Sequence, residues 1–288
     1  MIASQLAVDS LNIYWTDDSD GSDEGGSIMK APLGGGTPTL LASGQGGPDG
    51  LAVDATNVYW TTFSGETVAM VPIAGGTVTT LATGQWNPGP IVATATGIFW
   101  TNLGAGAPHG DIMSLPFTGG VPSTIVTGQV GPIAADSSNF YWAQGSSSSQ
   151  SDDILSMPLG GGPTTTIAPG VDAADFAVDA RNVYYVNQGT NANDNQDGSI
   201  VAVPLSGGPA VTLAAAQNSP FSIATDGENV YWTTFGYYEG GTVMKVAVGG
   251  GTPVTIASGQ GRPYDVVVDA TSVYWTEQDH GVVVKAPR

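Results

Sequence analysis

The chain has 288 residues, 41% of them apolar, and is long enough to bury a full hydrophobic core. Six Lys and Arg residues stand against 25 Asp and Glu residues, which gives a formal net charge of −19. Because a polyanion needs clustered basic side chains, we expect no nucleic-acid partner. A cation, a basic partner or a neutral glycan suits this charge better.

Residue counts exclude several other classes of protein and site. Without cysteine, the chain has no disulfide framework, thiolate metal site or cysteine nucleophile. No run approaches 18 apolar residues, so we expect no membrane insertion. The first ten residues, MIASQLAVDS, have neither a basic n-region nor an apolar h-region, so the signal of an exported protein would have been removed from this sequence. The 42 glycines and 19 prolines indicate many tight turns and argue against helices.

A repeated segment organises the whole chain. LAVDSLNIYWT at 6–16 returns as LAVDATNVYWT at 51–61, and five degenerate copies follow. The aromatic anchor of the seven copies is, in order, Trp15, Trp60, Trp100, Trp142, Tyr185, Trp232 and Trp275. The anchors are 40 to 47 residues apart, so we divide the chain into seven units that start near residues 6, 51, 91, 133, 176, 223 and 266.

Each unit contains four short strand-like segments. In the second unit, the apolar segment 51–53 is followed by the aromatic segment 57–61, the alternating segment 67–73 and a Gly-Gly turn at 75–76. A Thr-rich segment comes last, as in TPTLLASG at 37–44. Four strands joined by short turns and repeated about every 43 residues are typical of a propeller blade. The sequence therefore predicts an all-β fold, a seven-bladed β-propeller of four-stranded antiparallel blades, as a single domain over 1–288.

The two ends of the chain predict how the ring closes. The seventh unit stops at VVVKAPR, 282–288, which matches the third strand of the other units. At the other end only Gln5 separates Ser4 from the first strand at Leu6, which is too short for residues 1–4 to form the outermost strand of another blade. We therefore expect a three-stranded last blade with an exposed edge.

The segment GLAVDATNVYWTT, followed by a third strand and TLATGQ, resembles the YWTD repeat of low-density lipoprotein receptor-type propellers and of bacterial extracellular proteins with similar repeats. The resemblance covers essentially the whole chain and implies a secreted or cell-surface location. That receptor family has six blades where this chain has seven units, and the final Asp of the motif survives only as Asp17. The ligands of the receptors are therefore not carried over.

Most of the repeated residues are interpreted as scaffold. The Tyr-Trp pairs are expected to pack between blades, because aromatic burial supplies much of the core energy of such a ring. Six first strands end in an aspartate that can accept hydrogen bonds from turn amides. These residues are Asp9, Asp54, Asp136, Asp179, Asp226 and Asp269.

Candidate ligand-binding residues lie on one predicted face. In the resembled blade order, the second-to-third strand loops and the fourth-to-first connections share the face around the channel mouth, and the former vary from 5 to 12 residues. Exposed aromatic side chains beside carboxylates and amides suit a sugar or a peptide. The candidates are Phe63, Trp86, Asn87, Phe235, Tyr237, Tyr238, Arg262 and Tyr264.

Calcium is the candidate cofactor. Asp49, Asp175 and Asp265 lie just before their first strands and are predicted to point towards the channel mouth, where carboxylates could hold Ca²⁺. The acidic stretches 17–26 and 191–199 offer only partial calcium loops. Ser27 and Pro204 stand where the closing glutamate of an EF-hand would be.

Three functional hypotheses follow. The first is a non-catalytic binding module that presents its variable rim to a glycan, a peptide or a protein. The alternative is a calcium-dependent, lactonase-like hydrolase or lyase with its site at the channel mouth. A third is association through the unpaired edge of the last blade.

Overall fold

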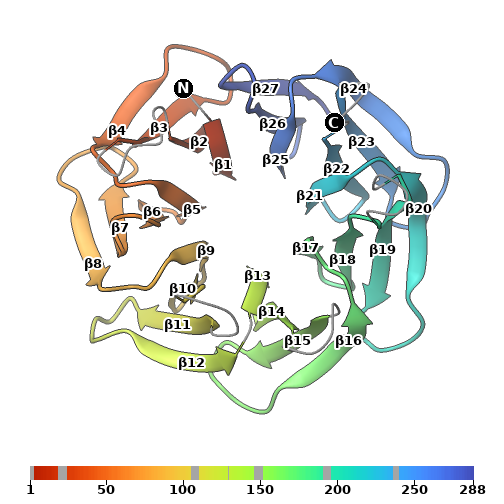
Figure 1. The fold of residues 1–288 in the computed structure, drawn as a ribbon. Coiled ribbons are helices and arrows are strands. Elements are labelled where there is room, and N and C mark those ends of the chain that lie inside the picture. Colours follow the sequence, from red (N-terminus) through yellow and green to blue (C-terminus); the bar gives the residue numbers. More distant parts are fainter. Residues whose placement is uncertain are drawn as a thin grey trace.

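In the computed structural model, the described residues form seven antiparallel sheets arranged as blades around a central channel (Figure 1). The structure describes residues 3–18, 25–104, 110–128, 130–145, 152–190, 196–235 and 240–288. Six of these sheets have four strands in chain order, and the sheet of blade 7 has three. The predicted seven-bladed propeller with a three-stranded last blade is confirmed.

The strands follow one scheme in every blade, running from the channel outwards (Figure 1). The innermost strands are β1 (Ala3–Val8), β5 (Pro48–Val53), β9 (Pro88–Ala93), β13 (Val130–Ala135), β17 (Asp175–Val178), β21 (Pro220–Thr225) and β25 (Pro263–Val268). The second strands are β2 (Asn12–Asp17), β6 (Asn57–Thr62), β10 (Gly97–Asn102), β14 (Asn139–Gly145), β18 (Asn182–Asn187), β22 (Asn229–Thr234) and β26 (Ser272–Glu277). The third strands are β3 (Ser27–Pro32), β7 (Thr67–Pro72), β11 (Gly110–Pro116), β15 (Asp152–Pro158), β19 (Gly198–Pro204), β23 (Gly241–Ala247) and β27 (Val282–Pro287). The outermost strands are β4 (Thr39–Ser43), β8 (Thr79–Thr83), β12 (Ser123–Gly128), β16 (Thr165–Val171), β20 (Val211–Gln217) and β24 (Val254–Gln260).

The hydrophobic core lies between the blades. Neighbouring residues of a strand face opposite sides of its sheet, so the Tyr and the Trp of each second strand point towards different blades. Tyr59 packs towards blade 3 and contributes to a cluster with Trp100, while Trp60 contributes to a cluster with Tyr14 of blade 1. Each such aromatic side chain removes about 150–250 Å² from water, worth about 4–6 kcal/mol at most. The predicted packing of the Tyr-Trp pairs is thus confirmed.

The turn between the first and second strands is fixed by the repeated aspartate. In blade 2, one carboxylate oxygen of Asp54 accepts hydrogen bonds from the amides of Thr56 (2.6 Å) and Asn57 (2.7 Å). The other oxygen accepts the hydroxyl proton of Tyr59 at 2.7 Å. Burial raises the pKa of Asp54, but these hydrogen bonds outweigh it and the net shift is downward. The expected turn-amide role of these aspartates is confirmed.

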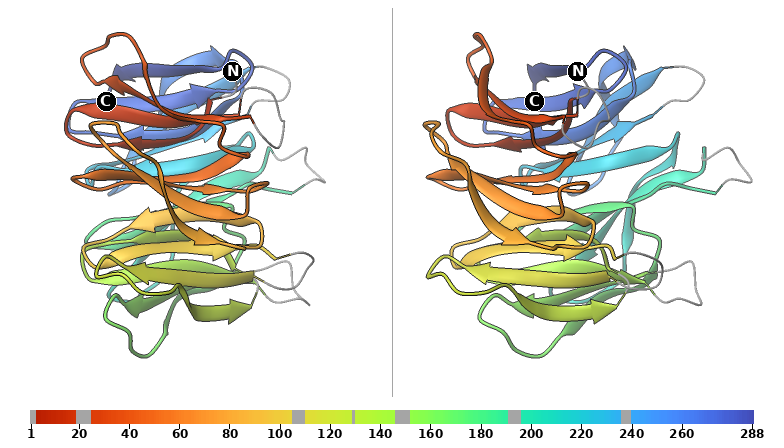
Figure 2. Two further views of the ribbon diagram at one scale, coloured as in Figure 1. Left: turned by 90° about the vertical axis from the view of Figure 1, so that its left-hand side faces the viewer. Right: turned by 60° about the vertical axis from the view of Figure 1, so that its left-hand side comes forward.

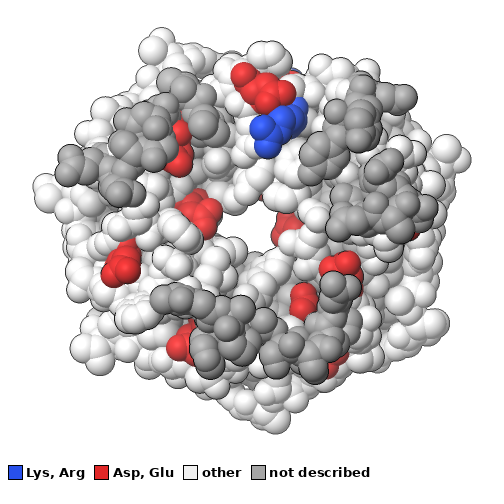
Figure 3. All heavy atoms as spheres, in the orientation of Figure 1, with Lys and Arg blue, Asp and Glu red and all other residues white. Residues whose placement is uncertain are grey.

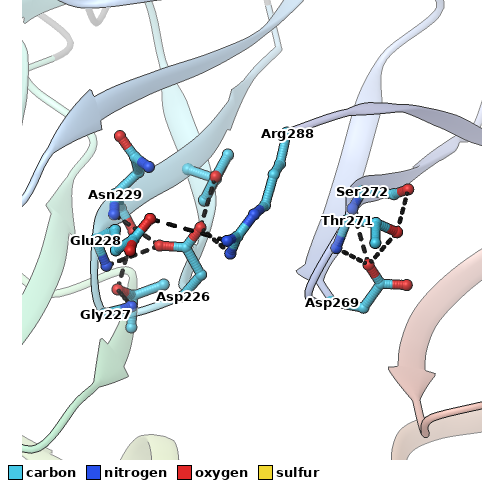
Figure 4. A network of polar contacts seen from close by, with 10 residues as sticks. Asp226, Gly227, Glu228, Asn229, Asp269, Thr271, Ser272 and Arg288 are labelled. Atoms are coloured by element: carbon cyan, nitrogen blue, oxygen red, sulfur yellow. Dashed lines mark hydrogen bonds and ion pairs between the residues drawn. The ribbon is translucent and has the colours of Figure 1, made fainter.

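The last residue of the chain binds one of these turns. A guanidinium nitrogen of Arg288 lies 2.7 Å from the carboxylate of Asp226 in blade 6 and another lies 3.8 Å from Glu228 (Figure 4). The backbone amide of Arg288 donates to the carbonyl of Thr271 in blade 7. Arg288 therefore joins blades 6 and 7 at the end of the blades where the first-to-second turns lie.

The side views show strand ends and turns on two opposite faces of the ring (Figure 2). The first-to-second and third-to-fourth turns lie on one face, and the remaining connections lie on the other, because successive strands are antiparallel. Within the described part of the chain, no helix is long and apolar enough to cross a membrane.

Candidate functional site at the channel mouth

The face formed by the second-to-third loops and the fourth-to-first connections is called the rim face here. Backbone hydrogen bonds hold the two kinds of connection together. Phe63 donates to the carbonyl of Gly47 at 2.8 Å, and Leu103 donates to that of Asn87 at 3.0 Å. The predicted sharing of one face by these connections is therefore observed in blades 2 and 3.

The fourth-to-first connections have a common backbone shape. The residue before the proline has positive φ at Gly47 (58°), Asn87 (47°), Ser219 (47°) and Arg262 (53°). This left-handed conformation suits glycine and asparagine best. The Asn87 side-chain amide donates to the carbonyl of Gly104 at 3.0 Å. Asn87, a predicted ligand residue, therefore shapes the loop through its backbone and its side chain.

A cavity of about 610 Å³ occupies the channel and is lined by the first strands of all seven blades. Asp49, Asp175 and Asp265 all line it, together with Ser222 and Tyr264. Figure 3 shows acidic side chains around and inside the central opening. None of the described residues that line the cavity is basic. The cavity therefore has negative potential with no cation built into its wall.

Three polar side chains occupy one equivalent position in the first strands of blades 5, 6 and 7, just before the residue that lies opposite the aromatic anchor. Each accepts a hydrogen bond from the first strand of the next blade. Asp175 accepts the amide of Ile223 at 3.0 Å, and Asp265 accepts the amide of Leu6 at 2.6 Å. Between them, Ser222 donates its hydroxyl to Asp265 at 2.9 Å and lies 3.4 Å from the amide of Val266. The row links four consecutive blades, from blade 5 to blade 1.

Both carboxyls of this row are hard to ionise. Burial, followed by the charge of Asp265, raises the pKa of Asp175 from 3.8 to about 7. Burial raises the pKa of Asp265 to about 6, although the hydrogen bonds from Leu6, Ser222 and Val266 act in the opposite direction. Near neutral pH, these carboxyls are therefore only partly ionised. A nearby cation would favour the loss of their remaining protons and so increase the negative charge of this part of the channel.

Asp49 lies one position earlier in the first strand of blade 2 than Asp175 and Asp265 do in the first strands of blades 5 and 7. Burial raises its pKa. At the equivalent position itself blade 2 has Gly50, where a Cβ atom would lie 2.4 Å from the carbonyl oxygen of Gly89 and 2.9 Å from the amide nitrogen of Ile91. The structure thus brings all three predicted carboxylates to one cavity, with Asp49 on the opposite side of blade 1 from Asp265.

The calcium hypothesis is not strengthened by this geometry. The described residues contain no group of three or more His, Asp or Glu side chains that could hold a metal ion. The oxygens of Asp175 and Asp265 already accept backbone hydrogen bonds. The residues at hand do not fit a calcium ion, and the metal role of these three aspartates stays a prediction. The central parts of the two acidic loops, 19–24 and 191–195, lie outside the described residues.

Predicted aromatic residues of blades 6 and 7 pack against one another. Phe221 contacts Phe235 and Tyr264, with ring centroids 4.4 and 4.7 Å apart. Arg262 lies over the Phe235 ring at 6.0 Å and is 3.7 Å from Asp279. Burial and the charges of Asp49, Asp265 and Asp175 raise the pKa of Tyr264 to about 12, so its hydroxyl stays protonated at the cavity wall.

The predicted aromatic residues of blades 2 and 3 are open to solvent. Trp86 is 59% exposed and Phe63 is 45% exposed. Leu103, which was not among the predicted residues, is 41% exposed. Single exposed apolar residues are ordinary, but three on adjacent connections of one face suit a protein contact. The predicted Tyr237 and Tyr238 lie outside the described residues.

Sequence reasoning missed two kinds of functional residue. Ser222 and Phe221 were overlooked, although alignment of the seven units places Ser222 in the same column as Asp175 and Asp265. The glutamine of the repeated ATGQ or ASGQ segment was also overlooked. Gln45 and Gln85 accept the indole protons of Trp60 and Trp100, at 3.0 and 3.1 Å, from the preceding blade.

Comparison with known proteins supports the fold. No protein-family model matches the chain, and no curated protein sequence matches it significantly. Solved structures that it resembles include a chain of the crystallised nidogen/laminin complex, with a TM-score of 0.58 and 19% identity over 79% of this chain and 88% of that one. Hydrazine synthase of Kuenenia stuttgartiensis has a TM-score of 0.75 and 13% identity, with coverage of 97% and 93%.

Two further neighbours carry names of enzymes. A streptogramin B lyase has a TM-score of 0.62 and 14% identity, covering 84% of this chain and 83% of its own. A putative 6-phosphogluconolactonase from Bacteroides uniformis has a TM-score of 0.71 and 13% identity, covering 96% and 92%. At these identities the likeness shows the fold alone, so the chain is a seven-bladed β-propeller with neighbours of both binding and enzymatic kinds.

Proposed function

We propose that this propeller is a non-catalytic binding module for a protein or peptide ligand, outside the cell or on its surface. Apolar side chains of the ligand pack on Phe63, Trp86 and Leu103, and a lysine or arginine of the ligand enters the channel mouth. The observation that carries this proposal is the acidic cavity without a basic lining residue, which opens on the same face as the exposed aromatic residues. Among the structural neighbours, the nidogen/laminin structure is a complex of two proteins, which supports a role in protein binding.

The chemistry of the cavity favours a cationic group. A guanidinium or ammonium that displaces water near Asp49 would gain charge-assisted hydrogen bonds. It would also lower the raised pKa values of Asp175 and Asp265, because a nearby positive charge favours the ionised carboxylates. Binding of a cation is therefore expected to strengthen as pH rises from about 5 to about 8, while both carboxyls lose their protons.

The test uses fluorescein-labelled hexaarginine as a probe, with fluorescence anisotropy read at 150 mM NaCl. Asp49→Asn removes one carboxylate from the channel mouth. It breaks no hydrogen bond between described residues. We expect it to weaken binding by about three- to tenfold, or ~0.7–1.4 kcal/mol. Glu228→Gln, a charge-matched control on the opposite face, should change the affinity much less. Equal effects of the two variants would mean that the probe senses only net charge.

Trp86→Ala supplies a second arm of this test. Because its side chain is mostly solvent-exposed, the substitution should leave the melting temperature within about 1 °C. Retention of a peptide in which leucines alternate with arginines should fall, since the apolar contact is lost. Loss of the folded state in this variant would contradict a role at the surface.

The second candidate is a hydrolase or lyase with its site in the same cavity. Two carboxyls with raised pKa values near neutrality, Asp175 and Asp265, are the feature that favours it, because general acid-base catalysis uses such groups. A panel of chromogenic esters and lactones incubated with the protein and with Asp175→Asn separates the two candidates. Turnover that the variant abolishes would favour the enzyme.

A further inference from the structure

The outer edge of blade 7 is open. β27 (Val282–Pro287) is the outermost strand of its sheet, whereas every other described blade carries a fourth strand outside the third (Figure 1). Beside β27, between blades 7 and 1, lies a mainly apolar groove of about 370 Å³. Its walls include Ile13, Trp15 and Leu33 of blade 1 and Tyr274, Val283 and Lys285 of blade 7. We call this groove the strand slot.

The other blades show what fills the equivalent place. In blade 1, Leu41 and Ala42 of β4 belong to a cluster that includes Val58 and Trp60 of blade 2. In blade 6, Ile256 and Ala257 of β24 pack on the cluster that contains Val273 and Trp275 of blade 7. A fourth strand therefore covers the Trp side of the following blade with a Leu or Ile and an Ala. At the junction of blades 7 and 1, no described strand supplies this pair against Ile13 and Trp15.

A second observation is the hydrogen bonding of the repeated tryptophan. The indole N–H groups of Trp60, Trp100, Trp232 and Trp275 each donate to a glutamine that follows, or ends, the fourth strand of the preceding blade. Those bonds are 2.9–3.1 Å long. The Trp15 indole has no hydrogen-bond partner among the described residues. Trp142 donates instead to Gln144 of its own strand. Among the described residues, the slot therefore lacks both the apolar pair and the glutamine found at four of the other junctions.

We propose that the strand slot binds an extended segment of a partner polypeptide, which pairs with β27 and completes blade 7. The fourth strands of blades 1, 2 and 6 share a sequence pattern that we expect the partner segment to have. The pattern is Thr-x-x-x-(Leu/Ile)-Ala-(Ser/Thr)-Gly-Gln. Strand addition to a free sheet edge gains main-chain hydrogen bonds, and the side-chain pockets select the sequence.

The register of the added strand follows from blade 1. There β3 pairs with β4 antiparallel, with Ile28 opposite Ala42. Val283 is the equivalent of Ile28, because each lies opposite the threonine of its YWT segment. The partner's alanine would therefore lie opposite Val283, and its glutamine would accept the Trp15 indole proton.

A second copy of this chain suits the slot less well than such a partner. β27 reads VVVKAP and is followed by Arg288, so it lacks the Ala-Ser-Gly-Gln ending. Pairing of two β27 strands would also bring Lys285 and Arg288 of both copies to one short interface. Like charges on adjacent strands are destabilising. We therefore assign the slot to a segment whose sequence differs from that of β27.

The experiment uses the 288-residue protein and a synthetic peptide, acetyl-TPVTIASGQ-amide, whose sequence is that of residues 252–260. We expect the peptide to bind in calorimetry, to raise the melting temperature and to slow amide hydrogen exchange within 282–287. A peptide with Ile256→Asp should not bind, and one with Gln260→Ala should bind at least about fivefold more weakly.

Trp15→Phe separates this proposal from non-specific binding. The variant should bind the parent peptide and the Gln260→Ala peptide with equal affinity, because the glutamine contacts only the Trp15 indole. In Trp60→Phe, by contrast, the parent peptide should still bind more tightly than the Gln260→Ala peptide. Trp86→Ala should leave peptide binding unchanged, so the outcome is independent of the proposed rim-face function. Absence of binding, or protection of 282–287 that appears without peptide together with a dimer in sedimentation, would overturn the proposal.

Discussion

At the scale of single residues, the channel carboxylates are links between blades. Asp175 and Asp265 accept amide protons from the first strands of the next blades, at 3.0 and 2.6 Å. Blade 5 has Val186 where blades 2, 6 and 7 have a threonine that donates to the next blade, and Asp175 supplies a replacement bond there. Burial in the channel removes water from each carboxylate and therefore raises the pKa of both Asp175 and Asp265.

The raised pKa values predict how stability depends on pH. Between the unfolded value of 3.8 and the folded values of about 6 and 7, the folded protein holds more protons than the unfolded chain. The free energy of unfolding should therefore fall as pH rises from about 4 to about 7. In Asp175→Asn this fall should shrink by about 1–2 kcal/mol, or roughly 2–6 °C in Tm, as measured by circular dichroism at pH 5, 6, 7 and 8. Parallel curves for the variant and the parent would contradict the assignment.

At the scale of the element, the turn aspartate and the tyrosine act as a pair. Asp54 and Tyr59 bond at 2.7 Å, and the same contact recurs in blades 1, 4, 5, 6 and 7 of the described structure. Blade 3 replaces both members at once, with Thr94 and Phe99. The hydroxyl of Thr94 lies 2.9 Å from the carbonyl of Gly97, and the Thr94 backbone amide donates to the same carbonyl, so this turn is held without a tyrosine hydroxyl. Phe99 can replace the tyrosine in blade 3 because Thr94 has no carboxylate that would need the tyrosine hydroxyl as a hydrogen-bond donor.

A double-mutant cycle in blade 2 tests this pairing. Asp54→Thr and Tyr59→Phe should each lower stability, since each leaves one partner of a half-buried hydrogen bond unsatisfied. Together they recreate the combination of blade 3, and their summed cost should exceed that of the double variant by about 0.5–2 kcal/mol. Urea unfolding measures the three differences. Strict additivity would mean that the two side chains act independently.

At the scale of the whole molecule, the ring closes between blades 7 and 1. Thr276 donates to the carbonyl of Ser4 at 2.9 Å and accepts the amide of Asp265 at 3.1 Å, while Asp265 accepts the amide of Leu6. Thr61 likewise donates to the carbonyl of Gly89 in blade 3 and accepts the amide of Gly50 in its own blade. Among the described residues, the junction of blades 7 and 1 has no fourth-strand contacts like those of blades 1 and 6, so these hydrogen bonds carry a larger share of the closure.

Matched substitutions compare the two junctions. Thr276→Val and Thr61→Val remove the same two hydrogen bonds, at about 1 kcal/mol each. We expect Thr276→Val to lower Tm more, and to speed hydrogen exchange in β1 and β27, because opening of this junction breaks fewer other contacts. Equal losses in Tm would show that all junctions open together. Addition of the peptide TPVTIASGQ should restore part of the loss in Thr276→Val only.

Sequence alone was enough to predict the ring. Period, strand order, the Tyr-Trp core and the turn aspartates are repeated in nearly every unit, and a repeat reports local structure directly. Strand starts were less accurate. The first strand of blade 2 begins at Pro48 rather than at Leu51, because an irregular register between Pro48 and Leu51 breaks the alternation that marks a strand.

The candidate site depended on tertiary structure. Asp175, Ser222 and Asp265 lie 47 and 43 residues apart, and Trp86, Phe63 and Leu103 come from different connections. Position within a unit predicted that these side chains lie near the channel mouth, but not which atoms of the next blade they reach. That depends on how adjacent sheets pack. The same packing decided that Asn87 shapes its own loop, that Arg262 is paired with Asp279, and that Trp15 is left without the glutamine that its equivalents bind.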